Sequence, residues 1–356
     1  MSIKRGVHFY SYQDKQFLGE FGLEECMKAA SETGATGFEL MPEQTRLGHF
    51  PNYTDEEVGH WFYLLDKYKL EPIDFVGFVD SPRRGKPDLP LDELVKQNER
   101  YIKICKQFKV PMLQVGFGTH QYKELIARSA PIAEEHGIKL AFVLGLNTAF
   151  SKEKIQEYID LIEKGNNKHV GFLLDFSLFS RRPSPSLIAQ LLRNGADKPT
   201  IDYILNSFEA GMDRNEIMSN VTFMVGADRF SRLQSEITYL PGYYRKTYSR
   251  PERALASFGG PCGAGVSNLD PAFIRDIAKY IFLCWGKCYD MTEDYVEPNI
   301  DYEAPISILK ECNWDGYITT MYEGQRNFHD ANAPYSADEV EAVRRHQEML
   351  KRLLEN

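Results

Sequence analysis

Residues 122–144 read YKELIARSAPIAEEHGIKLAFVL, an amphipathic helical pattern that stops at Gly137 and leads directly into an apolar run. A glycine just after the last helical residue is typical of a helix end. The run Ile138–Leu144 is too apolar for a strand with one solvated face, so it predicts a strand covered on both faces, as in a parallel sheet. The segment therefore predicts one helix–strand unit of an α/β protein.

The same unit recurs along the chain. Further helices are predicted over residues 23–33, 55–68, 91–108, 152–164 and 304–312, and further strands over residues 6–10, 36–40, 71–76, 111–115, 170–174, 280–285 and 316–322. Strands thus alternate with helices, and no Gly-rich turn follows the first strand. This favours a closed (β/α)8 TIM barrel over an open doubly wound sheet. We expect residues 1–356 to form a single barrel domain that ends in a charged helix over residues 336–355.

Residues 183–270 interrupt this alternation after the sixth strand. They hold two short helical patterns, over residues 186–193 and 200–210, and then a stretch rich in Gly, Pro and Tyr. An insertion here leaves from the C-terminal rim, where TIM barrels carry their active sites. We expect a lid or an oligomer contact that buries at least one of Tyr239, Tyr243 and Tyr244. The alternative is that the insertion only adds surface to the barrel and has no role of its own.

Composition and charge exclude several classes of protein. The 356 residues include 42 Lys+Arg and 51 Asp+Glu, so the net charge is 42 − 51 = −9, which argues against nonspecific nucleic-acid binding. No 18 apolar residues follow one another, as a transmembrane helix would require, and the N-terminus lacks the apolar run of a secretory signal. Six cysteines are scattered without a CxxC motif, which is typical of reduced thiols. We therefore expect a cytoplasmic protein.

Three stretches at the ends of the last strands carry a resemblance to a known family. They are LDFSLFSRRP over residues 174–183, WGKCYDMTED over residues 285–294, and NWDGYITTMYEGQR over residues 313–326. With them, nearly the whole chain resembles the sugar phosphate isomerase/epimerase family, the xylose isomerase-like TIM barrels. The resemblance implies sugar chemistry with one Mn²⁺ or Mg²⁺ ion, held by Glu, Asp, His and Glu at the ends of strands five, six, seven and eight.

Only one of the four implied metal positions keeps its ligand. Asp175 matches, whereas Val143, Trp285 and Met321 stand where the resemblance places Glu, His and Glu. One carboxylate cannot hold a divalent ion against water and competing ligands. The two missing glutamates would also be the acid and the base. We therefore expect neither a bound metal, nor another cofactor, nor metal-dependent isomerase chemistry.

Polar side chains remain at the predicted barrel mouth. Strand side chains alternate, so Lys287 faces the same way as Trp285, and Glu323 the same way as Met321, one layer nearer the rim. Asp175, Lys287 and Glu323 are therefore the candidate catalytic residues, with Lys287 replacing part of the charge of the metal. A residual salt bridge between Asp175 and Lys287 is the alternative.

Four further residues are candidates for substrate binding. Arg181 and Arg326 lie on loops next to the mouth, and His8 and Glu39 lie on the first two strands. His8 is the best general-base candidate by residue type. Glu39 stands in an apolar context, so it points inward only if it has a partner. A packing role for His8 and solvated positions for the arginines stay open.

Two functions are compatible with these features. The first is a sugar- or glycoside-binding family member that has lost metal catalysis and acts as an accessory subunit, beside a catalytic paralogue or a small partner chain. Some barrels that the chain resembles, including C-glycoside deglycosidases with a small β-rich partner, work in such complexes. The second is an active isomerase, epimerase or lyase on a keto-sugar, without a metal, in which Lys287 and Glu323 form the ionisable pair. Both predict a homo-oligomer or hetero-oligomer, without nucleic acid or membrane.

Overall fold

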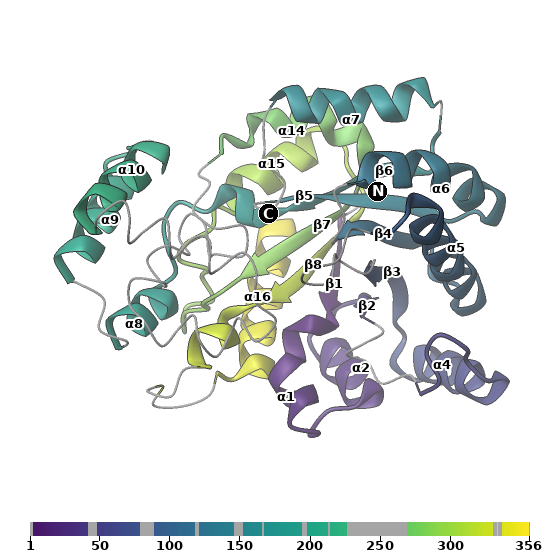
Figure 1. The fold of residues 1–356 in the computed structure, drawn as a ribbon. Helices are drawn as coiled ribbons and strands as arrows, with labels where there is room; N and C mark the ends of the chain where they lie inside the picture. The colour runs from purple at the N-terminus through teal and green to yellow at the C-terminus, as the bar shows by residue number, and fades with distance from the viewer. Residues whose placement is uncertain are drawn as a thin grey trace.

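The computed structural model contains a closed barrel of eight parallel strands with helices around it, as predicted (Figure 1). The structure describes residues 3–41, 48–78, 89–117, 121–145, 152–165, 167–193, 198–212, 214–225, 269–329, 333 and 337–355. The strands are β1 (Lys4–His8), β2 (Gly37–Leu40), β3 (Glu71–Phe78), β4 (Met112–Phe117), β5 (Lys139–Leu144), β6 (Val170–Asp175), β7 (Ile281–Cys288) and β8 (Tyr317–Tyr322). Each strand pairs with the next one, and β8 pairs with β1 to close the barrel.

The helices follow the predicted pattern closely. The long ones are α2 (Leu23–Glu32), α4 (Asp55–Tyr68), α5 (Leu91–Phe108), α6 (Tyr122–His136), α7 (Lys152–Lys164), α15 (Glu303–Glu311) and α16 (Glu339–Glu355), and the short ones are α1 (Gln13–Phe17) and α14 (Ile274–Ile277). Local signals set their ends. Helix α4 begins with a capping box of Thr54 and Glu57, and α6 ends at Gly137 in the left-handed conformation.

Two strands differ from the prediction. The first strand was expected over residues 6–10, but β1 ends at His8 and a 3-10 turn, η1 (Phe9–Tyr12), follows. The side chain of His8 causes this early end, because its Nδ1 accepts the amide hydrogen of Tyr10 at 3.0 Å and so caps the turn. Strand β7 extends to Cys288, which keeps Lys287 within the strand.

Apolar side chains form two layers. Large residues such as Phe38, Trp61 and Phe172 fill the space between the strands and the helices. A second cluster, which includes Leu173 and Trp285, fills the barrel interior. Between β2 and β3 the register shifts at Phe38/Glu39, so a bulge changes which side chains face inward on β3.

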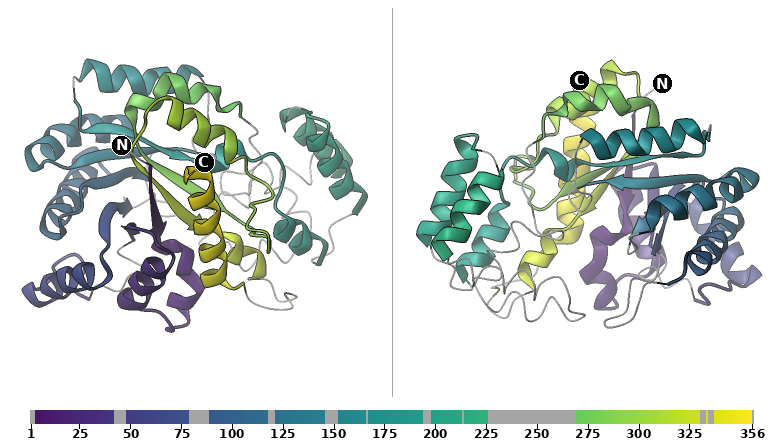
Figure 2. Two further views of the ribbon diagram at one scale, coloured as in Figure 1. Left: turned by 180° about the vertical axis from the view of Figure 1, so that it is seen from behind. Right: turned by 45° about the horizontal axis from the view of Figure 1, so that its top comes forward.

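The last helix fastens the barrel by a chain of buried hydrogen bonds. Gln347 on α16 donates to the Thr320 hydroxyl at 2.7 Å, and His346 contacts Thr320 through Nδ1 at 2.8 Å and the Tyr302 hydroxyl through Nε2 at 2.7 Å. The Tyr302 hydroxyl in turn donates to the Lys287 carbonyl oxygen at 2.5 Å. Helix α16, the yellow helix near the C-terminus, lies against β8 (Figure 2). The hydrogen bonds that start from it therefore connect β8 with the Lys287 segment of β7.

The described part of the insertion after β6 consists of three helices. These are α8 (Pro185–Arg193), α9 (Lys198–Glu209) and α10 (Arg214–Val225), and they share an apolar cluster separate from the barrel core. Helices α9 and α10 lie apart from the barrel in both figures, whereas α8 approaches the mouth (Figures 1 and 2). There Arg193 donates to the Asn327 carbonyl oxygen at 2.8 Å, and Ser186 donates to Asp290.

The predicted burial of Tyr239, Tyr243 or Tyr244 concerns residues outside the described ranges, so the lid or oligomer role stays a prediction. Of the helices that the structure describes, none has the length and apolar character needed to span a membrane.

Candidate functional site

The structure brings Asp175, Lys287 and Glu323 together at the C-terminal rim of the barrel. Asp175 is the last residue of β6, Lys287 lies near the end of β7, and Glu323 directly follows β8. The Lys287 Nζ donates a short hydrogen bond to Glu323 Oε1 and lies 3.8 Å from Asp175 Oδ2. All three side chains are buried. We call this group the rim cluster.

Arg326 extends the rim cluster toward the first strand. It lies in the 3-10 turn η5 (Gly324–Phe328), where its Nη1 is 2.9 Å from Glu323 Oε2 and its Nε donates to the Tyr10 hydroxyl at 2.5 Å. Burial by itself would raise the pKa of Glu323, but Arg326 and then Lys287 outweigh it and lower the pKa to about 2. Glu323 is therefore a carboxylate at neutral pH.

Asp175 differs electrostatically from Glu323, although Lys287 contacts both. Burial raises the pKa of Asp175, and the nearby Lys287 ammonium and the hydrogen bond from the Ser177 amide offset this only in part. The two carboxyl groups of the rim cluster therefore have pKa values displaced in opposite directions. Such a difference is typical of functional sites but also occurs in structural ion pairs.

The four positions where related barrels would hold a metal do not offer a suitable set of ligands. Val143 is half-buried, Met321 and Trp285 are buried, and Asp175 is already close to the Lys287 ammonium. The Trp285 indole crosses the barrel, so its Nε1 donates to Glu39 Oε2 on β2 at 2.7 Å. In the described part of the chain, no three His, Cys, Asp or Glu side chains are grouped so that they could hold a metal ion. A divalent ion therefore does not fit this donor set.

His8 and Glu39 lie below the rim, beneath the Trp285 indole. Their closest atoms, His8 Nε2 and Glu39 Oε2, are 3.9 Å apart, and the His8 ring meets the Trp285 ring edge to face with centroids 5.6 Å apart. Burial, and then Lys287, lower the pKa of His8 to about 3, so the ring is neutral. Burial raises the pKa of Glu39 to about 7, against the Thr319 and Trp285 side chains, which lower it.

Arg181 lies away from the rim cluster. Its side chain is 64% exposed and forms an ion pair with Asp301. The loop position after β6 was readable from the sequence, but the direction of a flexible side chain was not. Its predicted contact with a substrate stays a prediction.

Two buried polar residues of the interior were missed by the sequence analysis. Asp74 on β3 and Gln114 on β4 are both fully buried. Burial raises the pKa of Asp74 well above its usual value, and the nearby Glu39 raises it further. The backbone amides of Phe75 and Gln114 lower this pKa in part, although neither forms a hydrogen bond with the carboxyl group. A polar residue within each of the apolar runs Glu71–Phe78 and Met112–Phe117 was the available signal.

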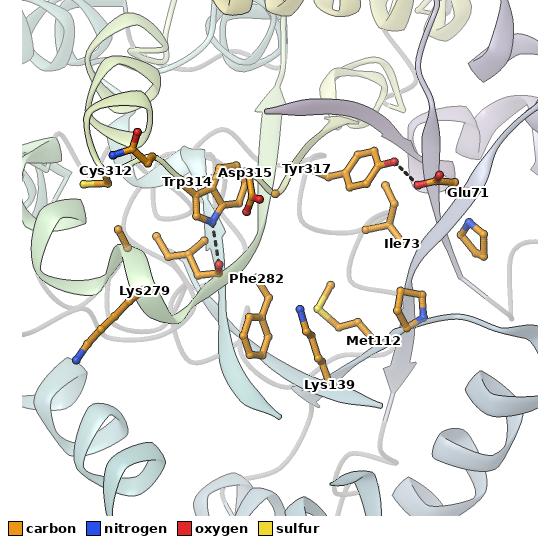
Figure 3. A pocket seen from close by; sticks show the side chains of 16 residues that line it. Glu71, Ile73, Met112, Lys139, Lys279, Phe282, Cys312, Trp314, Asp315 and Tyr317 are labelled. Atoms are coloured by element: carbon orange, nitrogen blue, oxygen red, sulfur yellow. Dashed lines mark hydrogen bonds between the residues drawn. The ribbon is translucent and has the colours of Figure 1, made fainter. Parts of the chain in front are cut away.

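A cavity of about 500 Å³ opens at the opposite, N-terminal end of the barrel (Figure 3). Polar groups around it already have partners: Tyr317 donates to Glu71 at 2.8 Å, and the Trp314 indole donates to the Ile281 carbonyl oxygen at 2.8 Å. TIM barrel enzymes place their catalytic residues at the C-terminal ends of the strands. The rim cluster is therefore the candidate site.

Comparisons with known proteins agree with the fold and the sugar-related resemblance. A profile of the family described as "Xylose isomerase-like TIM barrel" matches residues 27–204, which are 178 of the 356 residues. A C-glycoside deglycosidase alpha subunit of Microbacterium trichothecenolyticum is 25% identical over 324 residues, which are 90% of this chain and 83% of that protein. A C-glycoside deglycosidase alpha subunit of Arthrobacter globiformis is 22% identical over 357 residues, covering 99% of this chain and 93% of that protein. A solved sugar phosphate isomerase/epimerase of Parabacteroides distasonis has a TM-score of 0.54 at 11% identity, with 99% and 96% of the two chains covered, and so shares the fold.

Proposed function

Because the chain belongs to the xylose isomerase-like TIM barrel family, we propose that it binds a sugar or glycoside at the rim cluster. In this proposal it serves as a subunit of a carbohydrate-processing complex and does not carry out the metal chemistry of related barrels. The observation that carries this proposal is the replacement of metal ligands by Val143, Trp285 and Met321 around a Lys287 ammonium held between two carboxylates. The remaining groups can bind hydroxyl and carbonyl oxygens but do not match a divalent ion.

The rim cluster offers both kinds of hydrogen-bonding group that a sugar needs. Lys287 and Arg326 donate, whereas Asp175 and Glu323 accept. The two cations and two carboxylates balance in charge when both acids are ionised, so the cluster suits an uncharged sugar better than a sugar phosphate. The buried position of the four groups strengthens their interactions with a ligand.

A partner chain is the second part of the proposal. The relatives from Microbacterium and Arthrobacter are named as alpha subunits, and the similarity extends over nine-tenths or more of this chain. By analogy with these relatives, we expect a second chain to bind beside the barrel and complete the surface around the mouth.

A metal-free deglycosidase, isomerase or epimerase activity is the second candidate function. It is favoured by the contrast within the rim cluster between Asp175, whose pKa burial raises, and Glu323, whose pKa Arg326 and Lys287 lower to about 2. Two carboxyl groups with separated pKa values can act as proton donor and proton acceptor at one pH. In this case Lys287 and Arg326 would stabilise negative charge that develops on a keto oxygen.

Calorimetric titration tests the proposal with a flavone C-glucoside, its 3-keto form and methyl β-D-glucopyranoside. We expect at least one of them to bind the chelator-treated protein, and Glu323→Gln and Arg326→Lys to weaken binding roughly tenfold, which corresponds to about 1.4 kcal/mol. Arg275→Lys, at the exposed ion pair with Glu311 outside the rim cluster, is the matched control. Absence of binding by the wild-type protein would refute the proposal, and turnover by the isolated chain would favour the second function over a binding role.

A further inference from the structure

Below the Trp285 indole, the barrel interior contains one fully buried polar side chain on each of its first four strands. They are His8 on β1, Glu39 on β2, Asp74 on β3 and Gln114 on β4. Six of their polar atoms have no hydrogen-bond partner in the described part of the chain: His8 Nε2, Glu39 Oε1, both carboxyl oxygens of Asp74, and both amide atoms of Gln114. A buried polar group without a partner is costly, and such groups are few in natural proteins. We call these four residues the inner layer.

The inner layer is continuous on one side of the barrel. His8 is the register partner of Glu39, and Glu39 is the register partner of Asp74, so three of the polar side chains are direct neighbours. Gln114 pairs with Val76 and Ala141, which face the interior. On the opposite side, Leu173 and Leu283 make the interior apolar. The four polar side chains therefore lie on one half of the wall of the barrel.

The mixture of donors and acceptors specifies the kind of ligand. His8 Nδ1 accepts from the Tyr10 amide, so the neutral ring carries its hydrogen on Nε2 and donates from there. Gln114 can both donate and accept, and so can Glu39 and Asp74 when their carboxyl groups keep a proton, which burial favours. A bare cation would leave the donors unpaired, and an anion, which only accepts, would leave the acceptors unpaired. Hydroxyl groups, each of which donates and accepts, match the whole set.

We propose that the inner layer is a second binding subsite that holds hydroxyl groups of the sugar, and that it becomes continuous with the rim cluster when the Trp285 indole turns aside. This inference rests on the proposed function. Trp285 separates the two levels, because its Nε1 is bound to Glu39 below while its ring lies 5.3 Å from the Lys287 Nζ above. A ligand hydroxyl that donates to Glu39 replaces the indole hydrogen bond, so binding and displacement of the ring occur together.

The subsite makes an unusual prediction about stability. If the inner layer were structural, removal of its polar groups would destabilise the protein. For a binding site, the unpaired groups reduce the stability of the ligand-free protein, and their removal raises it while affinity falls. Gln114→Leu keeps the volume and removes two unpaired atoms. Leu283→Met, on the apolar side of the same cluster, is the matched control.

The test uses a flavone C-glucoside and its monodeoxy derivatives, with calorimetric titration, thermal unfolding and tryptophan fluorescence as readouts. We expect Gln114→Leu and Asp74→Asn to bind the glucoside at least tenfold more weakly than the wild type, with an unfolding midpoint that is unchanged or higher. We also expect one hydroxyl whose removal weakens binding to the wild type but not to Gln114→Leu. The glucoside should change the fluorescence of the wild type and not that of Trp285→Phe.

Three results would overturn the subsite. One is wild-type affinity in both inner-layer variants while Glu323→Gln still weakens binding, which would leave the rim proposal intact. Another is a large loss of stability in Gln114→Leu, which would assign the inner layer a structural role. A wild-type protein that binds none of the glycosides would remove the subsite and the proposed function together.

Discussion

Lys287 is the residue on which the rim cluster depends, because it is the cation that both Asp175 and Glu323 approach. Glu323 retains Arg326 if the lysine is removed, whereas Asp175 loses its neighbouring positive charge. Removal of Lys287 therefore affects Asp175 more than Glu323.

Replacing Lys287 by Met should lower the free energy of unfolding at pH 8 by about 3 kcal/mol, since an uncompensated carboxylate is left in a buried position. The double variant Lys287→Met/Asp175→Asn should recover most of this loss, because it removes both charges. Urea unfolding of the two variants and the wild type measures the difference. Equal stability of the single and double variants would mean that the pair is not coupled.

Glu39 should make stability depend on pH. Its pKa is about 7 in the folded protein and near 4.5 when unfolded, so between these values the folded state binds more protons. Its contribution is thus fully present below about pH 4.5 and is lost as the pH rises through 7. We expect Glu39→Gln to reduce the fall in unfolding free energy between pH 5 and pH 8 by roughly 2 kcal/mol. Parallel pH profiles for the variant and the wild type would contradict this.

Val143, Trp285 and Met321, on β5, β7 and β8, belong to one interior cluster and offer no hard metal ligand. The Trp285 indole reaches from β7 across to β2, and Met321 belongs to the same interior cluster as Val143. Strand geometry is set by backbone pairing and by the packing outside the barrel, so these three side chains can change without moving the strands.

The triple variant Val143→Glu, Trp285→His and Met321→Glu should therefore gain metal affinity. Without metal it should be less stable than the wild type, because it buries two new carboxylates, and Mn²⁺ should raise its unfolding midpoint. Elemental analysis together with thermal unfolding measures both effects. The same triple variant with Asp175→Asn is the control and should respond weakly. No metal response in either would mean that the four positions do not converge.

Element boundaries followed from the sequence because helix ends and buried strands have local causes. Gly137 ends α6, and the apolar run after it forms β5, as the pattern predicted. The inward direction of Asp74 was not accessible in this way. With strict alternation, the side chains of Ile73 and Asp74 would face opposite sides of the sheet. The bulge between β2 and β3 lets both lie toward the interior. Side-chain directions on loops were equally inaccessible, as Arg181 illustrates.

At the scale of the whole molecule, the helices after β6 and the barrel have separate apolar cores. Ile204 on α9 is fully buried in the smaller cluster and has no part in the barrel core. Ile204→Ala should therefore raise hydrogen exchange in α8, α9 and α10, with a local loss of about 2–4 kcal/mol, while exchange in β5 and β6 stays slow. Leu174→Ala, within the barrel core, should instead raise exchange throughout. Uniform loss of protection in Ile204→Ala would show that the two cores unfold as one.

The bond from α16 to the first strand bears on how the chain folds during its synthesis. Gln347 donates to the Gly6 carbonyl oxygen at 2.6 Å, and β1 pairs with β8, so residues from the two ends of the chain must meet. While the ribosome is still making the second half, β1 has one unpaired edge that is open to association with other chains. The edge of β1 is covered only after β8 has been translated. The hydrogen bond from Gln347 to Gly6 forms only after α16 has been translated. Chaperone capture of the nascent chain should therefore end only after α16 has left the ribosome.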